Sequence, residues 1–186
     1  MKITRNRLFC CTFALITGSS MNSGMAKDTP MELSCRQFVQ SFYSWYKPEG
    51  KDDSPYSTED AIKKKTNDFD PELRRKLQDD CDAQAKAEGE IVGLDMDPFL
   101  NTNSDPYQRY ITGKITPKAG AYLVEVYGIN SGKKTNKPIV IPEARYKDKH
   151  WQFVNFHYGK SNIPVNENLV SILKCLREDR DKNSKR

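Results

Sequence analysis

The sequence IVGLDMDPFLNTNSDPYQRY, residues 91–110, joins two halves of the chain whose hydrophobic residues repeat with different periods. Before it, apolar residues recur every three to four positions, as in amphipathic helices, and after it they alternate, as in strands. Pro98 and Pro106 interrupt regular structure within the connector. We therefore predict an α+β fold in which residues 91–110 link helices to sheet and form one wall of any binding site.

Three helices are predicted before the connector. Ser34 is a candidate cap for a helix over residues 34–47, which ends before Pro48 and Gly50. A short charged helix over 58–65 follows, and Asp70 with Pro71 then predicts a third helix that runs to near Gly89. The first helix carries a strongly apolar face, made of Leu33, Phe38, Val39, Phe42, Tyr43 and Tyr46. Such a stripe is typical of a core, and ligand stacking by Trp45 or Tyr46 is the alternative.

Four strands are predicted after the connector, over residues 107–116, 121–129, 138–147 and 150–158. Short local turns between them favour an antiparallel meander. Pro142 predicts an edge position or a bulge in the third strand. Strict alternation in the last strand would place Trp151, Phe153, Asn155 and His157 on one face and Gln152, Val154, Phe156 and Tyr158 on the other.

An amphipathic helix with Leu169, Val170, Ile172, Leu173 and Leu176 closes the predicted domain. The expected organisation is a signal peptide over 1–26, a single α+β domain over 27–176 and a charged, flexible tail over 177–186.

The first residues have the layout of a secretory signal peptide. Three basic residues precede the apolar run LFCCTFALIT, residues 8–17, and Gly24-Met25-Ala26 provides a small-residue exit, so cleavage is expected after Ala26. The run is too short to span a hydrocarbon core of about 30 Å. Neither Cys10 nor Cys35 is placed for lipid attachment, since one lies inside the run and the other well beyond it. We expect a periplasmic or secreted bacterial protein with no stable membrane insertion, and a eukaryotic secretory route stays open.

Charge argues against nucleic acid as a partner. The chain of 186 residues carries +5, and removal of Lys2, Arg5 and Arg7 with the signal peptide leaves +2. The remaining basic residues are interleaved with acids, which is typical of solvated helix faces.

Three cysteines remain after signal removal: Cys35, Cys81 and Cys175. In an oxidising compartment one disulfide and one free thiol is the simplest expectation, with all three pairings open. A metal cluster is the weaker alternative because no CxxC spacing is present.

The acids of the connector are the first candidates for a site. Asp95, Asp97, Asn101, Asn103 and Asp105 alternate faintly like a calcium loop, but the sixth position lacks Gly and the twelfth lacks Glu. The simpler interpretation is that Asn101, Asn103 and Asp105 build turns. Asp95 and Asp97 lie between apolar residues, where partial burial would raise a carboxyl pKa and suit acid–base work, although hydrogen bonding to the sheet is the simpler role.

The predicted ligand-contacting residues are Asp95, Asp97, Asp105, Tyr110, Trp151 and His157. His157 is a strand histidine, most often a satisfied structural group. No nucleophile elbow, glycine-rich phosphate loop or HExxH motif occurs, so no catalytic residue, cofactor or metal is assigned.

Four segments together carry a resemblance to a known family: FYSWY (42–46), LDMDPFLNTNSDP (94–106), VEVYG (124–128) and WQFVNFHY (151–158). With the closing helix, they resemble a domain-of-unknown-function family of small bacterial envelope proteins, some of them lipoproteins. The resemblance implies a nuclear-transport-factor-two-like (cystatin-like) fold, with helices packed in a curved antiparallel sheet. Relatives often carry Gln before the last Asp of the connector, where this chain has Ser104, so a shared ligand contact there is not implied.

Two functions follow as hypotheses. The first is a non-enzymatic periplasmic binding or interaction protein, an envelope accessory or an immunity-like factor, whose partner is an envelope protein or a small ligand. The second is a cleft hydrolase or isomerase that uses Asp95 or Asp97 with His157, and it requires those groups to converge in one pocket.

Overall fold

The computed structural model describes residues 28–49, 54–87, 89–159 and 168–183, and it confirms the α+β class. The predicted signal peptide, residues 1–26, lies outside the described residues. The described elements are, in chain order, α1 (Pro30–Tyr46), α2 (Thr58–Lys64), the 3-10 turn η1 (Thr66–Asp68), α3 (Pro71–Lys86), β1 (Arg109–Lys118), β2 (Ala121–Asn130), β3 (Lys133–Lys134), β4 (Val140–Lys147), β5 (His150–Tyr158) and α4 (Leu169–Asn183).

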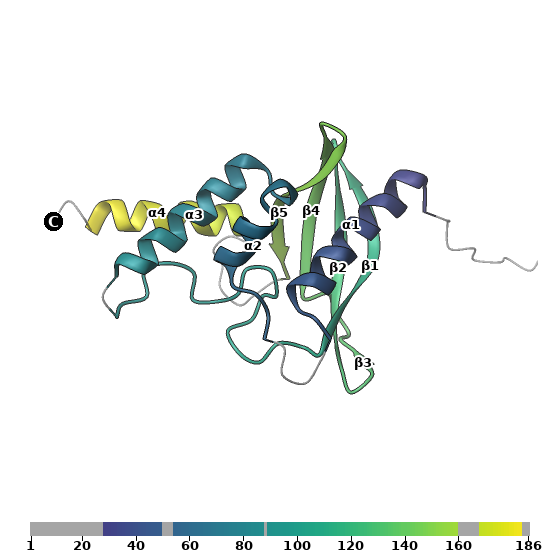
Figure 1. Ribbon diagram of the computed structural model, residues 1–186, viewed down its shortest axis with the longest axis horizontal. Coiled ribbons are helices and arrows are strands. Elements are labelled where there is room, and N and C mark those ends of the chain that lie inside the picture. The colour runs from purple at the N-terminus through teal and green to yellow at the C-terminus, as the bar shows by residue number, and fades with distance from the viewer. Residues whose placement is uncertain (1–27, 50–53, 88, 160–167, 184–186) are drawn as a thin grey trace, which may run out of the picture.

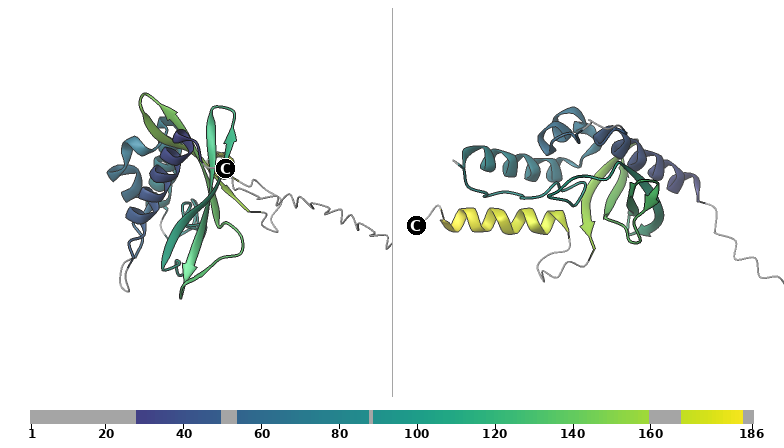
Figure 2. Two further views of the ribbon diagram at one scale, coloured as in Figure 1. Left: turned by 90° about the vertical axis from the view of Figure 1, so that its right-hand side faces the viewer. Right: turned by 90° about the horizontal axis from the view of Figure 1, so that it is seen from below.

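The strands form one antiparallel sheet in the order β1-β2-β4-β5, as the predicted meander requires (Figure 1). The described sheet has five strands rather than the predicted four, because the two-residue strand β3 pairs with the end of β2. The sheet is strongly twisted, and α1, α2 and α3 gather on one of its faces (Figure 2, left). This face carries the core.

Helix α1 begins earlier than predicted. Thr29, not Ser34, is its N-cap. The Thr29 hydroxyl accepts a hydrogen bond from the Glu32 N–H at 3.3 Å, and the Glu32 carboxylate accepts one from the Thr29 N–H at 2.7 Å. With Pro30 at the first helical position, this is a complete capping box. Ser34 instead lies inside the helix, where its Oγ accepts from Trp151 Nε1 at 3.0 Å.

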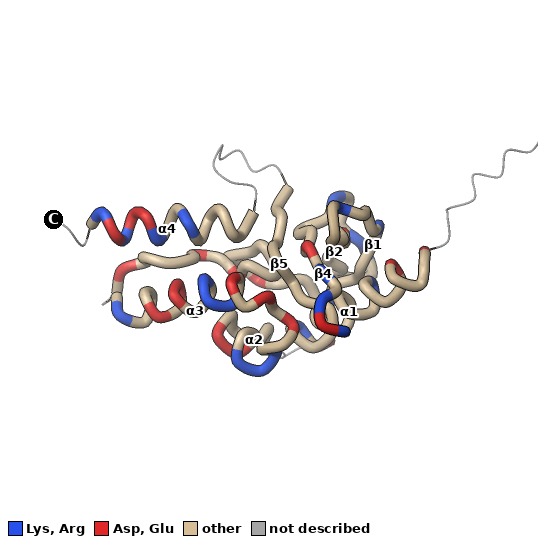
Figure 3. The backbone as a smooth tube through the Cα atoms, turned by 90° about the horizontal axis from the view of Figure 1, so that it is seen from above, with Lys and Arg blue, Asp and Glu red and all other residues tan. Residues whose placement is uncertain are grey.

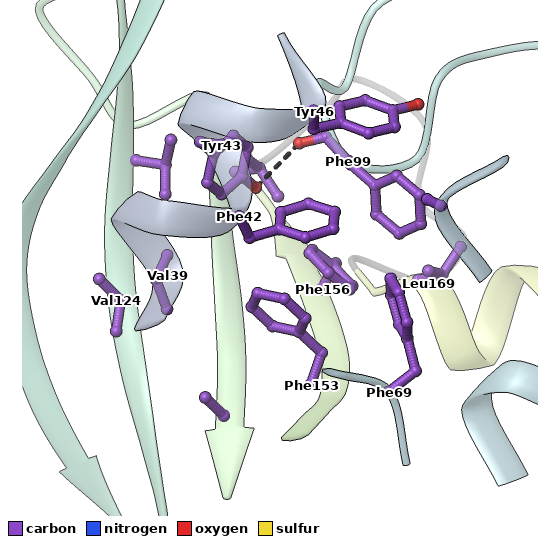
Figure 4. Packing of buried hydrophobic residues seen from close by; sticks show 14 of the residues in the cluster. Val39, Phe42, Tyr43, Tyr46, Phe69, Phe99, Val124, Phe153, Phe156 and Leu169 are labelled. Carbon is purple, nitrogen blue, oxygen red and sulfur yellow. Dashed lines mark hydrogen bonds between the residues drawn. The ribbon is translucent and has the colours of Figure 1, made fainter. Parts of the chain in front are cut away.

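The aromatic face of α1 is the centre of the core (Figure 4). The Phe42 ring lies 4.9 Å from Phe153 and 5.4 Å from Phe99, centroid to centroid, and both contacts are edge-to-face. Such pairs add about 0.5–1.5 kcal/mol each beyond area burial. The predicted core role is therefore confirmed for the buried residues Val39, Phe42, Tyr43 and Tyr46, but Leu33 is 48% exposed and lies outside the core. Truncating Phe42 to alanine would cost about 3–5 kcal/mol.

A bulge in β5 changes the predicted sorting of its faces. Glu143 pairs with Asn155 and Ala144 with Phe153, so Val154 is an extra residue without a partner on β4. The extra residue reverses the alternation, and the buried rings of Phe153 and Phe156 both reach the core, 5.1 Å apart. The prediction that these two residues occupy opposite faces was wrong, because a bulge shifts the two-residue period by one.

The bulge also accounts for Pro142. This residue lies within β4, which is an interior strand between β2 and β5, directly before the register shift. Two positions were predicted for Pro142. The edge-strand prediction was wrong, and the predicted bulge is present next to Pro142, on the paired strand β5.

Helix side chains and a loop cover parts of both sheet edges. At the β1 edge, Gln40 of α1 accepts from the Thr112 N–H at 2.9 Å and donates to the Tyr110 carbonyl at 3.0 Å. At the β5 edge, the Asp70 N–H donates to the Phe153 carbonyl at 2.9 Å. These bonds occupy backbone groups that would otherwise be open to another strand.

Helix α4 extends further than the predicted closing helix, from Leu169 to Asn183. Residues 177–183, predicted as part of a flexible tail, are its second half. Arg180 in this segment pairs with Asp80 of α3 at 2.8 Å, a contact between residues a hundred positions apart that holds the end of α4 against α3. Helices α3 and α4 lie side by side beyond the β5 edge (Figure 1).

Candidate functional site

The second half of the connector is a tight turn over residues 97–102. The Asp97 N–H donates to the Thr102 carbonyl at 2.8 Å, and Asn101 adopts a positive φ of 49°. Asp97 Oδ1 accepts from the N–H groups of Phe99 and Leu100 at 2.8 and 3.0 Å. This Asx-type turn, which Asp favours through such side-chain bonds, places Phe99 and Leu100 in the core, where both are 0% exposed.

The remaining oxygen of Asp97 is also occupied. Its Oδ2 accepts from the Tyr46 hydroxyl at 2.9 Å. Burial raises the pKa of Asp97 above its ordinary 3.8, and the two backbone bonds and the Tyr46 bond oppose that rise. The structure therefore gives Asp97 a structural role, fastening the turn to the end of α1.

The first half of the connector is fastened to α3. Gln84 Oε1 accepts from the N–H groups of Val92 and Gly93 at 3.0 and 3.1 Å, and its Nε2 donates to the Glu90 carbonyl at 2.8 Å. Asp80 Oδ2 accepts from the Leu94 N–H at 2.9 Å. One amide and one carboxylate on successive turns of α3 thus fix the backbone course of the connector.

Asp80 also binds α4. It is 4% exposed and pairs with Arg180, whose Nη1 donates in addition to the Val92 carbonyl at 2.9 Å. A Cβ at Gly93 would lie 2.8 Å from Asp80 Oδ2, so the close approach of the connector requires glycine there. The position of the connector consequently depends on α3 and α4 together.

Between the connector, the end of α1 and the start of α2 is a cleft of about 380 Å³, which we call the connector cleft. Its lining residues are Tyr46, Tyr56, Ser57, Thr58, Gln84, Ile91, Leu94, Asp95, Met96, Asp97 and Asn103. The cleft is within the size range of small-ligand sites, which is about 300–1,000 Å³.

Two lining residues distinguish the cleft from ordinary surface. Ile91 is 73% exposed, the largest exposure among the large hydrophobic residues described. Asp95 is exposed, and its carboxylate makes no hydrogen bond or ion pair with any other described residue. Asp95 therefore differs from Asp97, whose two oxygens are engaged within the fold.

The other predicted site residues lie elsewhere. Asp105 is exposed on the connector outside the cleft lining. Tyr110 is buried in the core, and its hydroxyl accepts from the Tyr107 N–H at 3.1 Å. Trp151 packs against Tyr122 and Tyr146 near the start of β5 and donates to Ser34. Of the six predicted residues, only Asp95 and Asp97 line the cleft.

His157 lies on the face of the sheet opposite the core, between the core-facing residues Phe156 and Tyr158. Its Nε2 lies 2.8 Å from Glu143 Oε2, which also accepts from Lys118 Nζ at 2.8 Å. Burial of Glu143 would raise its carboxyl pKa, but the bonds from Lys118 and His157 outweigh that effect and lower it.

The predicted acid–base pair is not brought together. Asp97 lies on the core side, where Tyr158 donates to the Pro98 carbonyl at 2.9 Å, whereas His157 points to the opposite face. The arrangement that the enzyme hypothesis requires, with Asp95 or Asp97 and His157 in one pocket, is therefore not present.

The described cysteines are free thiols, in contrast to the predicted disulfide. Cys35 is buried in the first half of α1, whereas Cys81 lies on α3 and Cys175 on α4. Burial raises the pKa of the Cys35 thiol to about 12 and that of Cys81 to about 11. Thiols with raised pKa values react slowly as nucleophiles.

Neither a metal cluster nor a membrane-spanning helix is found in the described ranges. No three His, Cys, Asp or Glu residues there are grouped so as to hold a metal ion. None of the helices there combines the length and the apolar character needed to cross a bilayer.

Comparisons with protein-family models, curated proteins and solved structures found no match to this chain. Its class is therefore defined by its own geometry, as an α+β protein with helices on one face of an antiparallel sheet. Its particular feature is a cleft formed where the connector leaves α3.

The sequence-based prediction missed Gln84 and Tyr56 as cleft residues, whereas Ile91 belongs to the connector that was predicted to form one wall of a site. Gln84 has a usable signal, since it is a polar residue near the C-terminal end of a predicted helix and directly before the connector. Tyr56 has no such signal, because it joins the cleft only when α2 and the connector pack together.

Proposed function

We propose that this chain is a secreted binding or interaction protein of the bacterial envelope, and that the connector cleft is its binding site. The observation that carries the proposal is the combination, in one cleft, of a highly exposed Ile91 and an unpaired Asp95 carboxylate. Exposed apolar surface beside free polar groups is typical of sites that bind partners.

The wider context agrees with this proposal. The resemblance to small envelope proteins and the basic-then-apolar N-terminal sequence favour export to the periplasm, with an envelope protein or a small ligand as partner. Basic and acidic residues occur together on each of α2, α3 and α4 (Figure 3), a distribution that does not favour nucleic acid. We retain the nuclear-transport-factor-two-like fold as part of the proposal, since helices packed on a twisted antiparallel sheet suit it.

The test is site-specific photo-crosslinking of the full-length protein in bacterial cells. A photoreactive residue at Ile91 is expected to give a discrete adduct, whereas the same residue at Tyr146, which is 47% exposed near the end of β4, is expected to give none. Introducing Asn103→Trp fills the cleft from an exposed lining position and is expected to abolish the adduct. An adduct that survives Asn103→Trp, or equal adducts at both positions, would refute the cleft as binding site.

Export is tested separately. Fractionation is expected to recover the protein in the periplasm or medium, with Lys27 as the first residue of the mature chain. A cytoplasmic protein that retains Met1 or its neighbours would overturn the envelope assignment.

A further inference from the structure

The lining of the connector cleft is one-sided in charge. Among the described lining residues, Asp95 and Asp97 are the only ones with an ionisable carboxyl group, and none is Lys, Arg or His. Asp97 directs both oxygens into the fold, toward the 97–102 turn and Tyr46. Of these two described carboxylates, Asp95 is thus the one available to an incoming group, and a cation is the group that complements it.

Two described lysines on the Tyr56 side of the cleft are already engaged with other groups. Lys64 Nζ pairs with Asp60 at 2.9 Å and lies 4.5 Å from the centre of the Tyr56 ring. Lys65 Nζ lies 5.0 Å from the centre of the Trp45 ring. These lysines are held on the α2 side, on the stacked pair Trp45 and Tyr56, and neither pairs with Asp95.

The two chain neighbours of Asp95 are apolar. Leu94 and Met96 flank it and pack partly against the core, and Ile91 extends the apolar surface outward. An ammonium or guanidinium group on an aliphatic stem matches this arrangement, because its charged end meets Asp95 while its methylene groups cover apolar side chains. A divalent cation does not, since calcium requires six to eight oxygen ligands and a single free carboxylate supplies few of them.

We propose that the connector cleft binds a lysine or arginine side chain presented by an envelope polypeptide, with Asp95 accepting its hydrogen bonds. This inference rests on the proposed function and specifies the chemistry of its partner. Asp95 is the charge-recognising residue, and Leu94, Met96 and Ile91 supply the apolar contact.

The experiment uses two peptides that differ in a single charge. Isotope-labelled protein is titrated with acetyl-Ala-Lys-Ala-amide and with acetyl-Ala-norleucine-Ala-amide, and backbone amide signals are followed by NMR. The lysine peptide is expected to shift signals of residues 94–97 and Thr58 and to bind more weakly as salt is added. The norleucine peptide is expected to bind roughly fivefold more weakly, the upper range for an exposed ion pair.

Two variants locate the effect. Asp95→Asn is expected to remove the preference for lysine over norleucine, and Asp105→Asn, which removes an exposed acid of the same connector outside the cleft, is expected to preserve it. Equal binding of the two peptides, lysine binding that is unchanged in Asp95→Asn, or no binding of either peptide would overturn the cation inference. None of these results decides the proposed function, which depends on the crosslink at Ile91 and its loss in Asn103→Trp.

Discussion

The Tyr46 hydroxyl donates a 2.9 Å hydrogen bond to Oδ2 of Asp97, joining the last residue of α1 to the residue that opens the 97–102 turn. Burial raises the pKa of the Tyr46 phenol well above its ordinary value of 10.0, and the Asp97 carboxylate beside it adds to the rise, so the phenol stays a donor. This bond separates the two acids of the LDMDP segment. Asp97 serves the fold, whereas its neighbour Asp95 is exposed and has no hydrogen-bond or ion-pair partner among the described residues.

Asp97→Ala is expected to lower the free energy of unfolding by about 2–4 kcal/mol, because the Phe99 and Leu100 N–H groups and the Tyr46 hydroxyl lose their acceptor. Asp95→Ala serves as the control and is expected to change stability by less than about 0.5 kcal/mol, as for an exposed residue without partners. Urea denaturation of both variants makes the comparison. Equal losses in the two variants would contradict the division of roles.

Arg180→Met is expected to destabilise the protein by about 3–5 kcal/mol, since it leaves the Asp80 carboxylate, 4% exposed, without its cationic partner. The matched control is Arg177→Met on the same helix. Arg177 pairs with Asp79 at 3.4 Å, but the two side chains are 55% and 41% exposed, so a change below about 1 kcal/mol is expected.

Hydrogen exchange in the connector provides a second test of the Asp80–Arg180 pair. In hydrogen exchange, the Leu94 N–H, which bonds Asp80, is expected to lose protection in Arg180→Met and to keep it in Arg177→Met. Unchanged protection of Leu94 in both variants would show that α4 does not hold the connector.

Glu143 gives a pH-dependent contribution to stability. Lys118 and His157 hold the pKa of the buried Glu143 carboxyl below its ordinary 4.5, despite the opposing effect of burial, so the folded state keeps the charge to lower pH than the unfolded chain. The contribution is present above about pH 4.5 and is lost as the pH falls through the folded-state pKa. The stability difference between wild type and Glu143→Gln is therefore expected to shrink on acidification.

Stability curves from urea denaturation at a series of pH values measure this difference. Glu90→Gln, which removes an exposed carboxylate from the connector region, is the control and is expected to give a curve parallel to that of the wild type. A gap between wild type and Glu143→Gln that widens toward low pH would contradict the assigned role of Lys118 and His157.

The thiols are expected to react in order of burial. A pKa of about 12 for Cys35, against an ordinary 9.0, lowers its thiolate fraction at neutral pH about a thousandfold. Alkylation of the native protein followed by peptide mass spectrometry is expected to label Cys175 first, Cys81 more slowly and Cys35 only after unfolding. A disulfide-linked peptide containing Cys35 in a non-reduced digest would contradict the free thiols of the structure.

The ends of the helices and the faces of the strands show which structural features can be predicted from neighbouring residues in the sequence. Asp70 with Pro71 starts α3 as predicted, and the four long strands appear where alternation and turn residues place them, because caps, prolines and periodicity act over a few residues. The start of α1 was also encoded locally, by Thr29, Pro30 and Glu32, although the cap was placed at Ser34. The bulge at Val154 was not encoded locally, since it exists only in the pairing of β5 with β4.

By itself, the sequence determined the α+β class, the order of helices before strands, the apolar face of α1 and the position of residues 91–110 between helices and sheet. Only the tertiary structure decided that Asp97 is engaged and Asp95 is free, that His157 lies across the sheet from both, and that residues 177–183 continue α4. The physical reason is that these outcomes depend on partners distant in sequence: Tyr46 for Asp97, Glu143 for His157 and Asp80 for Arg180. Such contacts form only when the packed elements meet, and they leave no periodic trace in the chain.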